Sequence, residues 1–299
     1  MSVPSSCASC GVAENDDIKL TKCNACDLVL YCGDACQELH RPEHKGDCKR
    51  RVAELDEILF RQPESTHLGD CPICLLPLPN DATKYTTEPC CSKTICRGCD
   101  YALYLSETEQ SLEPTCSFCR HPIPETVKNL NLNVKKRLAV DDPVTTRLMG
   151  TFCINTVEDT GDEGFYTKAV EYLTKAAGLG DAVAHYQLSL FYQNGQGVEK
   201  DEEKELYHLE EAAIAGHPEA RYNLGCIEAN NRRFDRAVKH FIIAANLGEG
   251  PSLKALRHCY EDGHINKQDF AAALRAHQAA VDATKSPQRE AAEARLNGY

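Results

Sequence analysis

The chain has 299 residues, of which 42% are hydrophobic and 26% are charged, a composition ordinary for a globular protein of two or more domains and unlike that of a disordered chain. Its formal net charge of −12, without a visible cluster of Lys and Arg, argues against direct binding to nucleic acid. No secretory signal is visible at the start and no apolar run approaches the roughly 18 residues of a membrane span, so we expect a cytoplasmic or nuclear protein that does not bind membranes.

Cysteine is unusually frequent, with 18 residues against 2 methionines and no tryptophan, and fifteen of the cysteines precede Arg120. In a reducing compartment this density predicts metal ligands in preference to disulfides. We therefore expect two tandem binuclear zinc fingers, which are small zinc-stabilised α+β modules, followed by an all-α helical-repeat solenoid. The expected domains are a zinc finger at 1–50, a linker helix at 51–66, a second finger at 67–124 and repeats at 125–299.

The first fifty residues hold eight potential zinc ligands in four pairs, namely Cys7 and Cys10, Cys23 and Cys26, Cys32 and Cys36, and His44 and Cys48. Eight ligands make two tetrahedral sites. The Cys-x2-Cys pairs suit tight turns, whereas the two pairs spaced four residues apart predict one face of a helix. Because so short a segment buries little apolar surface, we expect zinc to stabilise it, by about 10–16 kcal/mol per structural ion.

Residues 7–48 resemble the MYND zinc finger in Cys7-x2-Cys10, Cys23-x2-Cys26, Tyr31-Cys32-x3-Cys36-Gln37 and His44-Lys45-x2-Cys48. The resemblance implies interleaved sites, with one zinc on Cys7, Cys10, Cys32 and Cys36 and the other on Cys23, Cys26, His44 and Cys48. His40 stands where the family often has tryptophan and is the alternative to His44 as a ligand. The family also implies a protein-interaction module, often for short proline-containing peptides. A metal-stapled spacer without a binding role is the alternative.

The segment that follows, Arg51–Arg61, places apolar side chains at helical spacing, at Val52, Leu55, Ile58 and Leu59. This pattern predicts a short amphipathic helix of its own. The helix should stop before Pro63, which introduces a linker.

A second group of eight candidate ligands comprises Cys71, Cys74, Cys90, Cys91, Cys96, Cys99, Cys116 and Cys119. Residues 71–124 resemble a RING finger, most specifically in Cys71-Pro72-Ile73-Cys74, Cys96-Arg97-Gly98-Cys99 and Cys116-Ser117-Phe118-Cys119-Arg120-His121-Pro122. The resemblance implies a cross-brace, in which one zinc takes Cys71, Cys74, Cys96 and Cys99. The second zinc takes the third and fourth ligands together with Cys116 and Cys119.

The third and fourth ligands depart from the RING pattern, because the usual Cys-x-His becomes Cys91-Ser92-Lys93. A protonated lysine has no lone pair to offer a metal. Cys90 and Cys91 would restore a site of four thiolates, although adjacent cysteines on one metal demand a tight backbone. A three-cysteine site completed by His121 or water is the alternative. Either way, four Zn²⁺ ions are expected in the chain.

RING fingers typically serve as ubiquitin ligases, and the resemblance implies docking of a ubiquitin-conjugating enzyme at Ile73 and Pro122. It also implies that the guanidinium of Arg120 positions the conjugated ubiquitin, a role that suits its fixed fork of donors. The alternative is that Ile73 and Pro122 pack locally around the metal and that Arg120 is a solvated charge. The tryptophan that many such fingers present is absent, so its place would fall to Tyr101, Tyr104 or Leu105.

A periodic pattern begins beyond Pro124, with aligned stretches spaced 36 and 32 residues apart at Lys175-Ala176-Ala177-x2-Gly180, Glu211-Ala212-Ala213-x2-Gly216 and Ile243-Ala244-Ala245-x2-Gly248. Such a period predicts stacked helix pairs. Paired alanines allow close helix packing, and the glycine suits a left-handed helix end. The pattern resembles Sel-one-like repeats over about residues 140–285, most clearly at Tyr186-x-Leu188, Gly195-x-Gly197-Val198, Asp201 and Lys204.

The ends of the repeat region are less regular than its middle. An eroded unit is expected over Pro143–Leu179, and a terminal helix over Gln268–Thr284 would cap the stack, with Glu290–Arg295 as a final turn. The remaining cysteines are expected to be small buried side chains and not ligands, at Cys153, Cys226 and Cys259.

The leading hypothesis is therefore a zinc-binding protein-interaction protein that acts as a RING-type ubiquitin ligase or ligase subunit. Its partners would be a ubiquitin-conjugating enzyme and a substrate or peptide, which the first finger and the repeats would hold. A non-catalytic adaptor that only binds proteins is the alternative. A third hypothesis, transcriptional regulation, would have to operate through bound proteins because the charge disfavours DNA.

Overall fold

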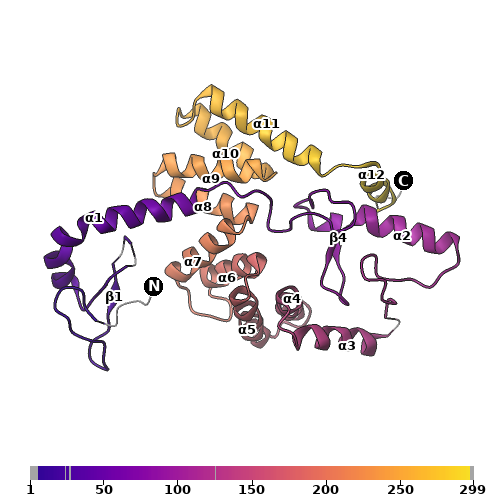
Figure 1. Ribbon diagram of the computed structural model, residues 1–299, viewed down its shortest axis with the longest axis horizontal. Coiled ribbons are helices and arrows are strands. Elements are labelled where there is room, and N and C mark those ends of the chain that lie inside the picture. The colour runs from indigo at the N-terminus through magenta and orange to yellow at the C-terminus, as the bar shows by residue number, and fades with distance from the viewer. Residues whose placement is uncertain (1–5, 24, 27, 125, 297–299) are drawn as a thin grey trace. The chain divides into compact units, whose positions relative to one another are not determined.

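The computed structural model describes residues 6–296 except 24, 27 and 125, and it divides into two compact units, Met1–Arg61 and Gln62–Tyr299 (Figure 1). In the first unit, strands β1 (Thr21–Lys22) and β2 (Leu30–Tyr31) pair antiparallel and are followed by helix α1 (Asp34–Leu59). The buried core of this unit is small and consists mainly of sulfur, at Cys7, Cys23, Cys26 and Tyr31.

Helix α1 corrects two expectations about the first unit. It continues without a break to Leu59, so the separate short helix predicted from Arg51 is the C-terminal part of α1. No proline follows Pro42 until Pro63, and nothing in between ends the helix. Cys32 lies before the helix and not on it, because Gly33 is extended and α1 begins only at Asp34.

The second unit begins with a module built on a short hairpin. The 3-10 turn η1 (Ala82–Lys84) leads into strand β3 (Tyr85–Thr87), which pairs antiparallel with β4 (Thr94–Cys96) in a register that joins Tyr85 to Cys96. Helix α2 (Arg97–Glu109) follows directly. Here too the core combines sulfur with few apolar side chains, at Cys71, Leu78, Ile95, Cys96 and Cys99.

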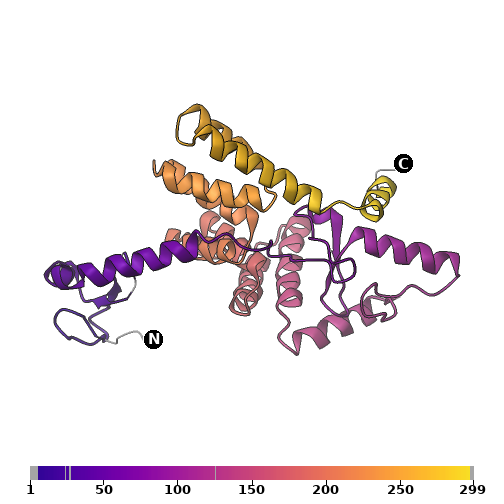
Figure 2. The ribbon, with the colours of Figure 1, turned by 45° about the horizontal axis from the view of Figure 1, so that its top comes forward.

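The rest of the second unit is helical, and most of its helices pack as antiparallel pairs, α4 with α5, α6 with α7, α8 with α9 and α10 with α11 (Figures 1 and 2). The predicted solenoid of stacked helix pairs is confirmed. None of the helices in the described ranges has the length and apolar content needed to traverse a bilayer. Their bounds are α3 Val127–Leu138, α4 Pro143–Thr160, α5 Gly164–Gly178, α6 Ala182–Asn194, α7 Glu202–Ile214, α8 Pro218–Asn230, α9 Phe234–Asn246, α10 Gly250–Glu261, α11 Lys267–Ala283 and α12 Pro287–Leu296.

The repeated alanines and glycines have the roles that their spacing predicts. Ala176, Ala212 and Ala244 are completely buried where one helix packs on the next. The glycine that ends each of these helices is left-handed, with φ of 89°, 86° and 86° at Gly180, Gly216 and Gly248. Because L side chains strain in this conformation, glycine lets each chain segment reverse within two residues.

The ends of the helical region differ from the prediction. Helix α3 was not predicted, and the final turn expected near Glu290 is the ten-residue helix α12, which packs on α2. Cys153 and Cys259 are buried in the helical cores as predicted, whereas Cys226 is half-buried at the edge of its core.

Residues 62–124 of the second unit, which we call the second zinc module, contact the repeats at two repeat turns. The backbone N–H of His67 donates to the Gly216 carbonyl at 3.0 Å, and Asn80 Nδ2 donates to the Leu247 carbonyl at 2.9 Å. A Cβ on Gly216 would lie 2.7 Å from the Ser65 carbonyl oxygen, so only glycine permits this approach. The repeat turns are thus fitted to the segment that precedes the second set of cysteines.

His67 lies at this contact in a stack of three rings, of which His217 is buried and His67 and Tyr186 are half-buried. Its ring centroid is 4.3 Å from that of His217, which in turn lies 4.4 Å from Tyr186. Burial lowers the pKa of His67 to about 4 and that of His217 to about 2. The Glu219 carboxyl, 3.1 Å from His217 Nδ1, does not reverse this, because burial raises its own pKa as well. Both imidazoles are therefore neutral in the folded chain.

We expect His67→Phe to reduce the loss of stability on acidification. The unfolded chain binds a proton at His67 with an ordinary pKa near 6.5, whereas the folded chain does so only near pH 4, so the free energy of unfolding falls as the pH drops below about 6.5. Phenylalanine keeps a ring in the stack and cannot titrate. Between about pH 7.5 and pH 6.0 the wild type should lose about 0.8 kcal/mol more than the variant, measured by urea unfolding with circular dichroism. His258→Phe is the control, since that side chain is 77% exposed; equal pH dependence in His67→Phe and wild type would contradict the assignment.

Candidate metal centres

Four clusters of side chains have the donor atoms of a zinc site. The ligand atoms of each cluster lie within 4.8 Å of one another. We number the clusters in chain order: the first is Cys7, Cys10, Cys32 and Cys36; the second is Cys23, Cys26, His44 and Cys48; the third is Cys71, Cys74, Cys96 and Cys99; and the fourth is Cys90, Cys91, Cys116 and Cys119.

The spacing of the sulfur atoms fits zinc. Four thiolates at a Zn–S distance of about 2.3 Å form a tetrahedron with edges of about 3.8 Å. The sulfurs of Cys74 and Cys96 are 3.8 Å apart, and those of Cys71 and Cys99 are 3.9 Å apart. A disulfide would need about 2.05 Å, and every cysteine is free. The expectation of four zinc ions is thus matched by four suitable clusters, in which zinc would act as a structural cross-link.

In the second cluster, the imidazole of His44 comes from the middle of α1. Its Nε2 atom lies 3.1 Å from the sulfur of Cys26. His40, the alternative ligand one helical turn earlier, lies outside the cluster and contacts the Tyr31 hydroxyl through Nδ1 at 3.0 Å. The rings of His40 and His44 stack with their centroids 5.6 Å apart. His40 therefore packs between the metal ligand and Tyr31.

In the fourth cluster, adjacent cysteines at the tip of the β3–β4 hairpin face the same point. The sulfur of Cys90 lies 3.4 Å from that of Cys119, and the sulfur of Cys91 lies 3.8 Å from that of Cys116. The tight backbone that this requires is provided by Ser92, which is left-handed at φ 56° and donates its N–H to Glu88 at 2.7 Å. His121, the alternative ligand, does not belong to the cluster.

Three of the Cys-x2-Cys pairs share one backbone arrangement, which we call a knuckle, at residues 7–12, 71–76 and 116–121. In each, the N–H of the first cysteine donates to the carbonyl five residues later, and its own carbonyl accepts from the N–H four residues later, at 2.8–3.0 Å. The residue four after the first cysteine is the fifth residue of the knuckle, and it has a positive φ. It is Gly11 (75°), Leu75 (59°) or Arg120 (60°). Glycine adopts this conformation most easily, so Leu75 and Arg120 retain side chains at some cost in strain.

The knuckle backbone also favours thiolates. The backbone N–H of Cys10 is the main cause that lowers the pKa of Cys7 to about 6. At Cys71, burial raises the pKa, but N–H groups led by that of Cys74 outweigh it and lower the pKa to about 7. At Cys26, burial dominates and raises the pKa to about 12. Within the first cluster, the pKa of Cys7 lies below that of Cys32, which hydrogen bonds with neighbouring thiols, led by Cys36, raise to about 12. Within the third cluster, the pKa of Cys71 lies below that of Cys99, which burial raises.

The residues expected to dock a conjugating enzyme lie at the surface of the two knuckles in the second unit. Ile73 is 42% exposed, and Arg120 and Pro122 are exposed as well. Leu75, which the sequence reasoning did not single out, is the most exposed of these apolar side chains at 73%. Neither Ile73 nor Pro122 is buried around the metal. On α2, the candidate replacements for tryptophan are half-buried at Tyr101 and exposed at Tyr104 and Leu105.

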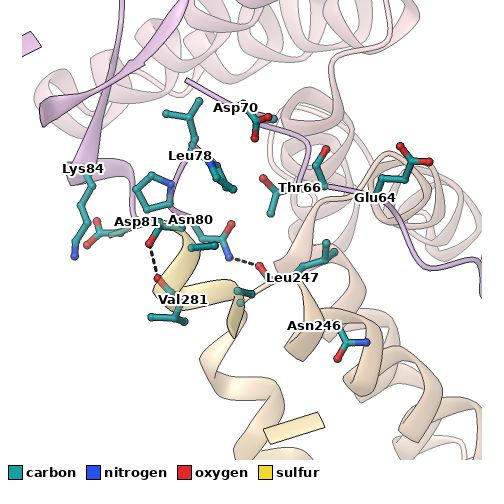
Figure 3. A pocket seen from close by; sticks show the side chains of 18 residues that line it. Glu64, Thr66, Asp70, Leu78, Asn80, Asp81, Lys84, Asn246, Leu247 and Val281 are labelled. Carbon is teal, nitrogen blue, oxygen red and sulfur yellow. Dashed lines mark hydrogen bonds between the residues drawn. The ribbon is translucent and has the colours of Figure 1, made fainter. Parts of the chain in front are cut away.

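A cavity of about 720 Å³ opens between two segments of the second unit, 64–70 and 77–84, and the ends of α9 and α11 (Figure 3). This size falls within the range of small-ligand pockets, roughly 300–1,000 Å³. Three carboxylates line it, from Glu64, Asp70 and Asp81. Its ammonium group, Lys84, pairs with Glu293 at 2.9 Å. The cavity contains no zinc ligand, and its carboxylates suit a ligand that carries positive charge.

Comparison with known protein families identifies the first zinc finger and the helical repeats. The sequence pattern of the MYND finger matches residues 7–48, and that of the Sel1 repeat matches 166–181, 182–217 and 218–249. The chain carries a MYND finger followed by Sel1 repeats. The MYND match contains the first two clusters, and the Sel1 match covers α6 to α9 with most of α5.

Two curated relatives match part of this chain, both with the name DAP3-binding cell death enhancer 1. The protein from Mus musculus is 25% identical over 209 residues, which cover 56% of this chain and 39% of the relative. The protein from Rattus norvegicus is 26% identical over 171 residues, which cover 44% of this chain and 33% of the relative. The matched region thus spans at most two-fifths of the relatives' length.

Two solved structures are also similar to the chain. A Sel1 repeat protein from Oxalobacter formigenes has 25% sequence identity and a TM-score of 0.42, over 56% of this chain and 66% of that one. A protective antigen of uropathogenic Escherichia coli with an SLR fold has 20% identity and a TM-score of 0.40, over 67% of this chain and 39% of that one.

MYND fingers and Sel1 repeats typically mediate contacts between proteins, so the chain is a zinc-finger protein with a protein-interaction role.

We expect Cys90→Ala and Cys91→Ala each to lower the zinc content from four ions per chain to three. Removal of one thiolate leaves the fourth cluster with three ligands, whereas the other three clusters keep their full sets. Native mass spectrometry of the purified full-length chain measures the stoichiometry. Cys226→Ala, a half-buried cysteine outside the clusters, should retain four ions. Four ions in both Cys90→Ala and Cys91→Ala would show that this pair does not ligate the metal.

Proposed function

We propose that the chain is a RING-type ubiquitin ligase, or a subunit of one, in which the second zinc module recruits a charged conjugating enzyme. The observation that carries the proposal is the pairing of the clusters in this module. Cys71 and Cys74 share a cluster with Cys96 and Cys99, while the pair between them along the chain joins Cys116 and Cys119. This interleaved pairing supports the proposal, because the RING fingers that the sequence resembles are cross-braced in the same way.

In this proposal, the docking surface for the conjugating enzyme lies at the two knuckles of this module. Ile73 and Leu75 are exposed on one knuckle, Phe118 is exposed on the other, and Pro122 is exposed directly after it. Exposed apolar side chains that gather around a rigid site are typical of protein interfaces. That Leu75 occupies a left-handed position where glycine would be easier supports a role for its side chain in binding.

In this proposal, Arg120 acts on the ubiquitin that the conjugating enzyme carries. It occupies the equivalent left-handed position of the second knuckle, its N–H donates to the Cys116 carbonyl at 3.0 Å, and its side chain is exposed. The zinc-bound backbone fixes the origin of the guanidinium. A planar fork of donors held in this way can bridge two proteins and keep a thioester in a reactive geometry.

The remaining parts of the chain would hold the substrate. The MYND finger and the repeats are protein-interaction modules, and the curated relatives are named for binding a protein, DAP3. We extend a protein ligand of this general kind to this chain. The carboxylates of Glu64, Asp70 and Asp81 in the cavity beside the repeats would suit a basic segment of that ligand. We place this activity in the cytoplasm or nucleus.

Incubation of the zinc-loaded chain with ubiquitin, activating enzyme and a panel of conjugating enzymes should produce ubiquitin chains. Ile73→Ala should reduce their formation by about 10-fold or more, because an interface anchor contributes roughly 2 kcal/mol. Arg120→Gly should do the same, since it removes the guanidinium yet suits the left-handed backbone. Gel electrophoresis of the products provides the measurement.

The chain offers a matched control for each variant. Ile214 is 39% exposed on α7, and Arg232 is exposed with φ 60°, so both reproduce the local setting away from the zinc knuckles. Ile214→Ala and Arg232→Gly should retain full activity. Absence of transfer with every conjugating enzyme would refute the ligase proposal and favour the adaptor, in which all three modules only bind proteins.

A further inference from the structure

The C-terminal helix α12 lies against the second zinc module, beside α2 (Figures 1 and 2). A short link, Thr284–Ser286, separates it from α11, the last helix of the repeat stack. Ala292, in the middle of α12, is 3% exposed, so the helix is packed and not merely adjacent. The end of the chain thus returns to the module that contains the third and fourth clusters.

Helix α12 approaches the module closely at Gly98, which lies between the zinc ligands Cys96 and Cys99. A Cβ at this position would lie 2.8 Å from both the backbone N and the Cγ of Arg289. Atoms of real side chains do not approach so closely, so the contact requires glycine in α2. The backbone of α12 therefore sits directly on the turn that provides two ligands of the third cluster.

Arg289 extends from this contact to Cys74, another ligand of the cluster. The residue is 5% exposed. Its Nη1 donates to the Pro77 carbonyl at 2.6 Å and to the Thr284 carbonyl at 2.7 Å. Its Nη2 donates to the Leu76 carbonyl at 3.2 Å and to the sulfur of Cys74 at 3.4 Å. One guanidinium thus joins the first knuckle of the module, a zinc-ligand sulfur and the end of α11.

The charge of the guanidinium needs a counter-charge. Burial of an unpaired cation is costly, and the four partners just described are three neutral carbonyls and one sulfur, with no carboxylate among them. A Zn²⁺ ion with four thiolates has a formal charge of roughly −2. That group is the anion which the geometry places against Arg289, whereas four protonated thiols would supply no charge.

We propose that Arg289 binds the zinc–thiolate group of the third cluster and that zinc binding at this cluster and docking of α12 strengthen each other. Zinc supplies the negative charge that makes burial of the guanidinium favourable, and the guanidinium stabilises the thiolate of Cys74. The coupling is reciprocal: if docking of α12 increases the affinity of the third cluster for zinc, then zinc binding must favour docking of α12 to the same extent. Loss of this zinc therefore releases the C-terminal helix. The coupling is independent of the proposed ligase activity.

The test challenges the zinc-loaded full-length chain with EDTA and pulses of N-ethylmaleimide, and maps alkylated cysteines by mass spectrometry. In Arg289→Met the four cysteines of the third cluster should become alkylated about 10-fold faster or more, while the first and second clusters keep their wild-type rates. Arg289→Lys, which restores the charge without the fork, should recover part of the protection. If only side-chain packing mattered, the methionine and lysine variants would behave alike, and that outcome would overturn the proposal.

Arg295→Met is the matched control, because Arg295 is exposed on the same helix. It should leave alkylation of all four clusters unchanged. The wild type provides a second measurement that does not depend on any variant folding. Hydrogen exchange of Pro287–Leu296 should accelerate in step with alkylation of the third cluster as EDTA removes zinc. Exchange that stays constant after Cys71, Cys74, Cys96 and Cys99 have been alkylated would disprove the coupling.

Discussion

Tetrahedral sets of sulfur ligands, one of them completed by an imidazole, take the place of an apolar core in the first 120 residues, and the other features of this region depend on them. The buried residues of the first unit's core are three cysteines and Tyr31, while those of the second zinc module are three cysteines with Leu78 and Ile95. Cores of this size are too small to order a chain by apolar burial alone. A metal that joins segments distant in sequence fixes the knuckles, the hairpins and the starts of α1 and α2 together. Surfaces built on such a frame, including those of Ile73 and Arg120, keep their shape although little packs behind them.

The sequence was most informative where the deciding interactions are local. A Cys-x2-Cys pair makes half a site by its own geometry, and the alanines and glycines of a repeat report the helix contact and the helix end directly, as at Ala212 and Gly216. The positive φ at the fifth residue of the knuckle could also be predicted, because glycine occupies this position in the first unit, at Gly11, and Leu75 and Arg120 occupy it in the second. That comparison was the available signal for Leu75.

Long-range contacts left no such trace. Arg289 and Cys74 are 215 residues apart, and nothing in either stretch indicates that they meet. Gly98 reads as an ordinary residue between two cysteines until α12 is seen to occupy the space of its missing side chain. Helix α1 was divided in two by the prediction because its apolar residues become periodic only near Val52, whereas the zinc ligand His44 holds the earlier turns. Interleaving of the clusters came from family resemblance, since spacing alone does not say which pairs share an ion.

The second zinc module meets the helical region near both of its ends, at α4 through a 2.8 Å contact between the hydroxyls of Ser92 and Thr145 and at α12 through Arg289. A solenoid whose repeats touch only their neighbours can gain or lose a repeat without penalty elsewhere. This chain cannot gain a repeat in the same way, because its helical region is attached to the second zinc module at both α4 and α12. An added helix pair would move one of these attachment points away from the module. The length of the stack is thereby matched to the span of the zinc module that it contacts.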